Sequence, residues 1–295
     1  MNSRTCLILF GGVFALSTSA IFVKAADAPS SVTAFYRLLL AGAVLVPALV
    51  LRDESRRELR TIRPDQWGKI LLAGAFLALH YMLWFESLRF TSVASSTVLV
   101  SMQPLFSLAL DRFAGGRRVR PAALAGCGIA LCGSVVIGSG DLRISGESLL
   151  GDVLAFVAAG VISLYFFVGE RARKELSAVT YSALSYLFSA GLLLAYILLR
   201  GEALRGYAAG TWLAFAGLAV ISTIGGQFVF NLLLRSVPAS AVTMSILGEP
   251  IGTCILARLL LRETVAPEQL AGIVLILSGM AVFFIRPAPK PAGAR

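Results

Sequence analysis

Apolar residues along the chain gather in ten runs, and short polar gaps separate one run from the next. Each run has about the 17–25 residues that an α-helix needs to cross the core of a bilayer. None alternates strictly between apolar and polar residues as a barrel strand does, so helices are the structure that satisfies the backbone in lipid. The pattern predicts ten spanning helices, at 5–25, 32–51, 67–88, 91–112, 120–139, 149–169, 178–199, 209–233, 238–260 and 266–286.

Composition supports an all-α, polytopic membrane protein. Hydrophobic residues make up 57% of the chain, charged residues 14%, and the mean hydropathy is +0.83, which lies outside the range of soluble domains. The net charge of +10 does not indicate a nucleic-acid partner, because the basic residues stand in the gaps and form no basic domain. The partner that we expect is the lipid bilayer. The most polar gap, 52–63, is expected to be a solvated loop.

The distribution of lysine and arginine between the gaps predicts the orientation of the helices. With the N-terminus inside, 18 of these residues lie on the cytoplasmic side, 7 on the outer side, and Arg37 lies within the second span. Basic residues accumulate in cytoplasmic loops, so both termini are expected in the cytoplasm. Arg4 before an apolar run, followed by Ala26-Asp27-Ala28, resembles a cleavable signal peptide. We expect a retained first helix instead, because residues 11–15 have a counterpart at 151–155.

A long segment of the chain occurs twice. Residues 88–136 align without a gap on 234–282, at a constant offset of 146, with fourteen identities in forty-nine positions. The identities include two prolines, two glycines and a Leu-Arg doublet, which is more than chance gives two Leu-rich stretches. Such repeats define architecture. We therefore expect a first five-helix repeat at 1–140, a second at 146–287, and a cytoplasmic tail at 288–295.

Five spans per repeat is an odd number, so corresponding gaps of the two halves face opposite sides of the membrane. The halves are then inverted repeats, related by a pseudo-twofold axis in the membrane plane. Secondary transporters commonly have this arrangement, with the substrate site near the midplane between the repeats. The pattern therefore predicts a transporter with a central cavity.

The repeat resembles a known family. Each half ends in a proline-containing fourth helix, a turn, and a fifth helix with the pattern x-Pro-x-x-Leu-Ala-Gly, as in the EamA-type branch of the drug/metabolite transporter superfamily. In the second half, Gly248-Glu249-Pro250 and Leu261-Arg262-Glu263 resemble the Glu-Pro and Leu-Gly-Glu signatures of that family. The first half departs from them with Gln103-Pro104 and Gly116-Arg117. The resemblance covers nearly the whole chain, and its motifs concern helix packing.

What the resemblance implies is a multi-pass secondary transporter of the bacterial inner membrane that exports small metabolites by alternating access. In length, loops and its aromatic third helix the chain looks most like amino-acid exporters, including those for aromatic amino acids. A lipid or sugar-lipid flippase of the same fold stays open as an alternative, and so does a membrane-embedded enzyme.

Polar and aromatic residues at membrane depth predict the substrate site, because such residues are costly in lipid and normally face a cavity. His80 and Trp84 share one face of the third helix, and Gln227 and Asn231 share a face of the eighth. Each also suits a plain hydrogen bond between helices. The predicted substrate-binding residues are His80, Tyr81, Trp84, Gln103, Tyr165, Gln227, Asn231 and Glu249.

Glu249 beside Pro250 has two open roles, which are packing against a neighbouring helix and direct contact with a substrate or a proton. Pro250 has no N–H and leaves the carbonyl of Ile246 without its helical partner, as Pro104 does for Val100. Small residues near these positions permit close packing or flexing. The predicted structural or hinge residues are Pro104, Pro250, Gly225, Gly226, Gly248 and Gly252.

Two cations lie near the outer ends of the first two helices. Lys24 is expected to snorkel to the interface, whereas Arg37, about a turn and a half inside its span, is a candidate to attract a carboxylate. The four cysteines lie in apolar segments without metal-type spacing, so neither a metal nor a cofactor is expected. P-loop, HExxH and GxSxG signatures are absent from the sequence, and the chain is not expected to be an enzyme.

Overall fold

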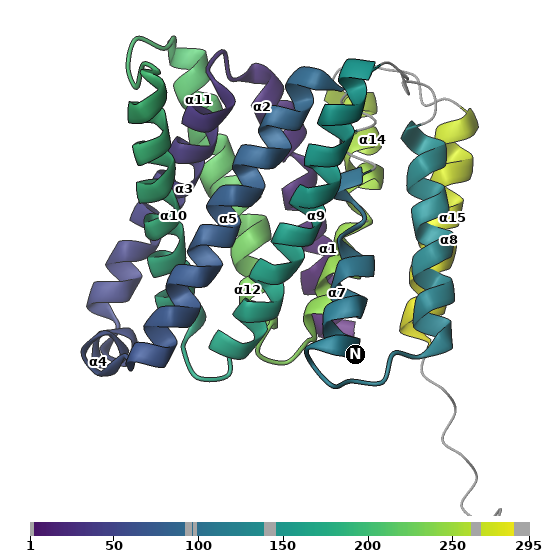
Figure 1. Ribbon diagram of the computed structural model, residues 1–295, viewed down its shortest axis with the longest axis horizontal. Helices are drawn as coiled ribbons and strands as arrows, with labels where there is room; N and C mark the ends of the chain where they lie inside the picture. The colour runs from purple at the N-terminus through teal and green to yellow at the C-terminus, as the bar shows by residue number, and fades with distance from the viewer. Residues whose placement is uncertain (1–2, 92–95, 97–98, 139–145, 261–266, 286–295) are drawn as a thin grey trace, which may run out of the picture.

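The computed structural model of the chain describes residues 3–91, 96, 99–138, 146–260 and 267–285. Within these ranges every regular element is a helix, as Figure 1 shows, and the predicted all-α class is confirmed. Two shorter apolar helices, Pro121–Val136 and Leu270–Phe284, accompany the long ones. Among the described residues, six helical segments are long and apolar enough to cross a membrane: Arg4–Val23, Ser30–Leu51, Pro64–Ser87, Ser148–Ala172, Ala178–Arg200 and Ala209–Leu233.

The helices follow the ten predicted spans closely. Part of the predicted span 91–112, the Leu261-Arg262-Glu263 motif and the predicted tail 288–295 lie outside the described residues. In the first half the helices are α1 (Ser3–Ser17), α2 (Ser19–Ala25), α3 (Ser30–Leu51), α4 (Asp53–Thr61), α5 (Pro64–Phe90), α7 (Gln103–Phe113) and α8 (Pro121–Gly138). In the second half they are α9 (Gly146–Ala172), α10 (Ala178–Arg200), α11 (Ala209–Gly217), η2 (Leu218–Phe228), α12 (Val229–Leu233), α13 (Ala239–Ile246), α14 (Glu249–Leu260) and α15 (Pro267–Phe284).

The predicted span 238–260 is not one continuous helix. It consists of α13 and α14, with Leu247 and Gly248 between them. Pro250 occupies the first turn of α14, a position where the missing N–H costs nothing. Pro104 has the same place at the start of α7. The prolines therefore mark helix starts within two membrane segments.

The polar gap 52–63 also differs from the prediction of a solvated loop, because α4 forms there. Asp53 and Glu54 lie in its first turn and Arg60 in its last. These charges stabilise the helix, because they interact favourably with its dipole at both ends. Glu58 fixes α4 to the bundle by accepting hydrogen bonds from the backbone N–H and the hydroxyl of Ser177, at 2.9 and 2.7 Å. The predicted polar gap is correct, but its residues form an ordered surface helix, visible at the lower left of Figure 1.

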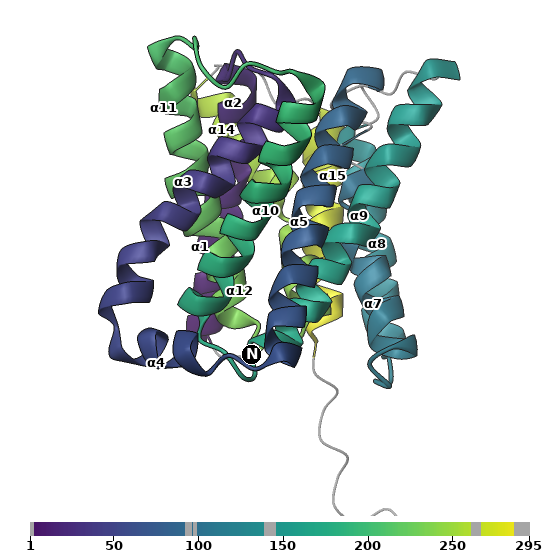
Figure 2. The same ribbon diagram turned by 60° about the vertical axis from the view of Figure 1, so that its left-hand side comes forward.

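Several helix contacts recur when the two halves are exchanged. The pair α5 and α9 is matched by η2 and α1, and the pair α7 and α9 by α14 and α1. Equivalent helices also pair directly, α3 with α10 and α8 with α15. The first helix of each half thus packs in the other half, which Figures 1 and 2 show for α1 beside the later helices and α9 beside α5.

Glycines let α8 and α15 approach closely at one edge of the bundle (Figure 1). A methyl group added at Gly279 would lie 2.4 Å from the backbone nitrogen of Ala130 and 2.5 Å from the carbonyl oxygen of Gly126. One added at Gly133 would lie 2.6 Å from the carbonyl oxygen of Gly272. These are backbone contacts that cannot yield, and small residues drive this kind of packing in membranes.

Replacing Gly279 with alanine is therefore expected to destabilise the protein by about 1–3 kcal/mol, the usual cost of overpacking. Thermal unfolding in detergent measures the change. Gly128→Ala on α8 is the matched control, because a methyl group there meets nothing within 4 Å. An equal melting temperature for Gly279→Ala and Gly128→Ala would contradict the close approach of the two helices.

A polar network covers the face of the bundle that carries α4. Glu175, between α9 and α10, accepts hydrogen bonds from Lys69 at 2.6 Å, Arg63 at 2.7 Å and Gln66 at 3.1 Å. The hydrogen bonds from Lys69 and Gln66, together with the nearby positive charges, lower the pKa of Glu175 below its usual value. The network ties the connection between α9 and α10 to the start of α5.

Glu175 is expected to make stability depend on pH on the acid side. Because its pKa is lower in the folded state, its contribution is complete above the unfolded value of about 4.3 and is lost as the pH falls through the folded value. Glu175→Gln should lower the melting temperature slightly at pH 7 and match the native protein near pH 3. Glu54→Gln on α4 serves as a charge-matched control, and parallel curves for native protein and Glu175→Gln would refute the expectation.

Candidate functional site

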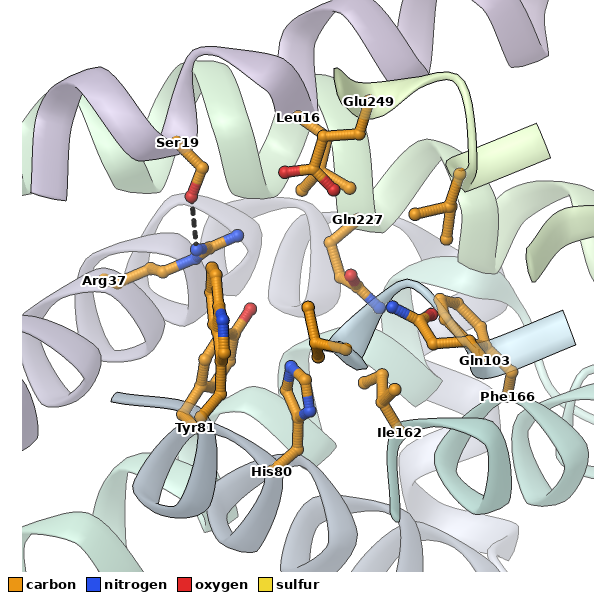
Figure 3. Close-up of a pocket in the computed structure, with 13 residues that line it drawn as sticks. Leu16, Ser19, Arg37, His80, Tyr81, Gln103, Ile162, Phe166, Gln227 and Glu249 are labelled. Carbon is orange, nitrogen blue, oxygen red and sulfur yellow. Dashed lines mark hydrogen bonds between the residues drawn. The ribbon is translucent and has the colours of Figure 1, made fainter. Parts of the chain in front are cut away.

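A cavity lies inside the bundle, with walls from both halves of the chain (Figure 3). Helices α1, α2, α3, α5 and α7 contribute from the first half, and α9, η2, α13 and α14 from the second. Six of the eight predicted substrate-binding residues line it: His80, Tyr81, Trp84, Gln103, Gln227 and Glu249. The other lining residues are Leu16, Ser19, Arg37, Val100, Ile162, Phe166 and Ile246.

The cavity is small. The space that the centre of a water molecule can occupy in it is about 40 Å³, and a single water molecule needs about 10–15 Å³ of such space. It therefore has room for a few water molecules but not for an amino acid. Any larger ligand requires the surrounding helices to move apart.

Most of the cavity wall consists of residues that the repeat relates. Equivalent positions of the two halves face each other here, although the side chains at each pair differ. For the first helices the offset is also 146, and not the 140 that relates residues 11–15 to 151–155, because Gly226 meets the carbonyl of Gly12 as His80 meets that of Ala158. At this offset the related lining pairs are Leu16 with Ile162, Tyr81 with Gln227, Val100 with Ile246, and Gln103 with Glu249. The cavity thus lies where the two halves meet, and its two walls have the same layout with different chemistry.

His80 and Trp84 form an aromatic wall on α5, as their spacing predicts. Their rings are stacked with centroids 5.9 Å apart and planes inclined by 19°. The Nδ1 of His80 lies 3.0 Å from the carbonyl oxygen of Ala158 on α9. Since a carbonyl only accepts, this bond puts the proton on Nδ1 and leaves Nε2 as an acceptor. The indole and imidazole together offer a flat apolar surface with polar edges.

Three polar atoms of the cavity lining have no hydrogen-bond partner in the part of the chain that the structure describes. They are Nε1 of Trp84, Oε1 of Gln103 and Nε2 of Gln227. Buried polar groups are nearly always satisfied by protein or water, and leaving one unpaired costs about 1–3 kcal/mol. The amides of Gln103 and Gln227 face each other in Figure 3. These atoms are thus available to a polar ligand.

Glu249 reaches the cavity from the break between α13 and α14. Its backbone carbonyl accepts a hydrogen bond of 3.0 Å from the hydroxyl of Ser17 on α1. Gly252, one turn later, permits this approach, because a methyl group there would lie 2.2 Å from the same hydroxyl oxygen. Gly248 lies in the break itself. The two glycines predicted as hinges therefore lie at a helix interruption and at a tight packing contact with α1.

Gly225 and Gly226 lie in η2, which has the wide turn of a π-helix. A methyl group at Gly226 would lie 3.1 Å from the carbonyl oxygen of Gly12 and 3.2 Å from Leu16 on α1. Widened helical turns of this kind occur frequently at functional sites. The glycine pair brings η2 against α1 beside the cavity.

Arg37 is a lining residue that the spacing rules did not place in the site. Its side chain is 1% exposed. Its Nε donates to the hydroxyl of Thr223 and one Nη to the hydroxyl of Ser19, both at 2.8 Å. Its guanidinium carbon lies 4.8 Å from the ring centre of Tyr81. The sequence could have indicated Arg37, because an arginine within a predicted span is unusual. Nothing in the sequence indicated that Ser19 lines the cavity. The Lys24 side chain lies outside the described residues.

Tyr165 and Asn231 are the two predicted residues that do not line the cavity. The side-chain nitrogen of Asn231 lies 2.6, 3.0 and 3.2 Å from the hydroxyls of Tyr165, Ser182 and Tyr186, and its two N–H groups donate among them. This network is fully buried between α9, α10 and α12. The structure therefore separates Asn231 from Gln227, although the two share a helix face in sequence.

The described residues include no group of three or more histidine, cysteine or acidic side chains that would hold a metal ion. Of the described cysteines, Cys6, Cys127 and Cys132 are free thiols.

Known proteins match this chain over nearly its full length. The model of the EamA-like transporter family matches twice, at residues 3–139 and 149–285. The uncharacterized transporter YwfM of Bacillus subtilis (strain 168) is 27% identical, over 97% of this chain and 95% of its own. A probable amino-acid metabolite efflux pump of Salmonella typhimurium (strain LT2) is 27% identical over 63% of this chain and 66% of its own.

A protein crystal structure has the same fold, with a TM-score of 0.80, 21% identity, and coverage of 96% of this chain and 98% of that one. The two matches of the family model cover both halves of the chain and agree with the paired helices and the paired cavity wall. The chain is a membrane transporter and no enzyme, and it belongs to the EamA-like transporter family of the drug/metabolite transporter superfamily.

Proposed function

We propose that the protein exports small amphipathic metabolites, amino acids including aromatic ones among them, by alternating access through the central cavity. The observation that carries this proposal is the set of unpartnered polar atoms on Trp84, Gln103 and Gln227 in a cavity lined by both halves of the chain. A stacked aromatic wall beside hydrogen-bonding groups suits a ligand with an apolar body and a polar end. The related efflux pump, named for amino-acid metabolites, supports the same substrate class.

The two halves act in this scheme as inverted repeats that rock about the cavity. The helix contacts that recur in both halves and the four related lining pairs support that symmetry. The network of Arg63 and Glu175 and the α4 helix lie on the face that is richer in lysine and arginine. By the positive-inside rule this face is cytoplasmic, with both termini on it, and the membrane is the bacterial inner membrane.

The direct test is uptake and counterflow of a labelled amino-acid panel in proteoliposomes that hold the purified protein. His80→Ala, Trp84→Ala and Gln227→Ala should each lower the initial rate while the protein stays folded. Normal initial rates for all three variants would remove the cavity from the transport path. Absence of flux for the whole panel would refute the amino-acid substrate class.

Proton coupling through Glu249 is tested by imposing a pH gradient. A coupled transporter shows flux that rises with the gradient and loses this dependence in Glu249→Gln, because the amide cannot carry a proton. A facilitator shows counterflow without a gradient, and Glu249→Gln then leaves the response to pH unchanged. We expect the first outcome, since an ionisable residue at membrane depth normally serves transport.

A lipid or sugar-lipid flippase is the second candidate, and an apolar groove beside the cavity favours it. The groove has a volume of about 390 Å³ and runs between α1, α14 and α15. Leu9, Val13 and Phe14 line one side, and Ile255 and Met280 the other. Scrambling of a fluorescent phospholipid in the same proteoliposomes, without amino-acid flux, would favour this alternative.

A further inference from the structure

Arg37 differs from a purely structural arginine in what holds it. A structural arginine in a membrane bundle is usually paired with an acid or with backbone carbonyls. Arg173 is of that kind, because its Nε donates to the carbonyl of Asn231 at 2.8 Å and one Nη to the carbonyl of Leu176. The hydrogen-bond partners of Arg37 are instead two neutral hydroxyls, those of Ser19 and Thr223.

These hydroxyls are themselves held in place. The hydroxyl of Thr223 donates to the carbonyl oxygen of Leu218 at 2.8 Å, so its lone pairs remain for the guanidinium. Thr18 and Ser222 beside them share a hydrogen bond of 2.9 Å. The interruption between α1 and α2 is thereby tied to η2, and the guanidinium is fixed from two helices.

The fixed guanidinium has donors left for a ligand. Arginine carries five N–H donors, and the two hydroxyls take two of them. Figure 3 shows the second Nη of Arg37 directed toward the middle of the cavity, with Gln227 and Glu249 on the opposite wall. The hydrogen bonds of this guanidinium go to neutral groups, and the carboxylate that it faces across the cavity is that of Glu249, so a ligand carboxylate can bind at Arg37 while a ligand cation faces Glu249.

We propose that Arg37, Ser19 and Thr223 form an anion subsite that binds the carboxylate of the transported metabolite. The inference rests on the proposed transport function and narrows its substrate class. The carboxylate binds on the α3 side, the ammonium group faces Glu249, and the side chain lies against Trp84. Carboxylates and zwitterions are then preferred over amines of the same size.

The test compares three ligands that share a phenyl ring: phenylalanine, 3-phenylpropanoate without the ammonium group, and phenethylamine without the carboxylate. Binding to the full-length protein is followed in detergent by tryptophan fluorescence. Native protein is expected to bind 3-phenylpropanoate at least tenfold more tightly than phenethylamine. Arg37→Gln should reduce this ratio to about one, and Arg37→Lys should keep part of it. Ser19→Ala, which removes one support, should lower it severalfold.

Arg89→Gln is the matched control, because that arginine pairs with Glu86 outside the cavity, and its ratio should equal that of native protein. If Arg37→Gln folds and its binding ratio is unchanged, the subsite is refuted. If Arg37→Gln does not fold, an unchanged binding ratio in both Arg37→Lys and Ser19→Ala refutes it. Sulfate that competes as well as 3-phenylpropanoate would also overturn it, in favour of an inorganic anion. Amino-acid flux with an unchanged ratio refutes the subsite alone, whereas carboxylate selectivity without flux refutes the proposed function alone.

Discussion

Replacing Gln227 with leucine is expected to lower transport at least tenfold and to leave the melting temperature unchanged or slightly higher. The side-chain nitrogen of Gln227 makes no well-aligned hydrogen bond among the described residues, so the folded protein loses little hydrogen-bond energy there. Leucine of similar volume removes an unsatisfied buried group, which is neutral or favourable for folding. The ligand, by contrast, loses a donor, and one hydrogen bond of about 1.4 kcal/mol corresponds to a factor of ten.

Asn231→Leu is the matched control, one helical turn further on, and it should show the opposite result. Its amide nitrogen, with two N–H donors, lies within hydrogen-bond distance of three buried hydroxyls, and each buried hydrogen bond that is lost costs about 1–3 kcal/mol. We expect a clearly lower melting temperature. Initial rates in proteoliposomes and thermal unfolding separate the two effects. A loss of transport with Asn231→Leu at full stability would show that the ligand reaches the buried network.

Arg117→Gln is expected to open one face of the transporter. Arg117 donates to Asp111 at 2.9 Å and to Glu170, and these two carboxylates are only 7% and 8% exposed. The same acids accept from the hydroxyl of Ser240 at 2.6 Å and the backbone N–H of Ala239 at 2.9 Å. The cluster thus fastens α7 to α9 and α13 across the two halves.

Removing the guanidinium leaves two buried carboxylates facing each other. Breaking a buried ion pair costs about 3–5 kcal/mol, and the lower end applies here because the Arg117 side chain is 39% exposed. Separation of α7 from α13 relieves the repulsion by admitting water. The balance between closed and open states should therefore shift strongly toward opening at this face.

Cysteine labelling measures that shift. Thr243 lies on α13, between the cluster and the cavity residue Ile246, and is 1% exposed. In a background without the native cysteines, Thr243→Cys should react slowly with a water-soluble maleimide and at least tenfold faster when Arg117→Gln is added. Arg171→Gln is the control, because Arg171 lies nearby but contacts the Phe167 ring and two carbonyl groups. Equal labelling in all three proteins would contradict a closing role for the cluster.

Much of the fold could be predicted from the sequence, because long apolar runs leave the backbone one choice in lipid. The interruptions within helices were harder to predict. Pro250 weakens the helix before it, but the pattern of apolar residues continues across 247–248, so one span was the natural prediction. The helix α4 was also missed, since its stability comes from caps, charges and the contact of Glu58 with Ser177.

The site was predictable where a costly polar side chain stood at membrane depth, as with His80, Gln227 and Glu249. Position along the helix decided the rest. Asn231 has the same spacing signal as Gln227, yet it lies one turn further along, where the helix faces α9 and α10 rather than the cavity. Ser19 carries no signal at all, because its role depends on where Arg37 from another helix arrives.

The cluster of Asp111, Arg117 and Glu170 has a further consequence, since the repeat does not reproduce its Asp111. The position equivalent to Asp111 is Ala257, which cannot accept from a guanidinium. Two identical halves related by a twofold axis would give inward-open and outward-open states of equal free energy. The difference between Asp111 and Ala257 removes that degeneracy. In the alternating-access scheme, the contacts of Asp111 with Arg117 and Ser240 therefore stabilise the state closed at this face, and a ligand must offset their free energy to reverse it.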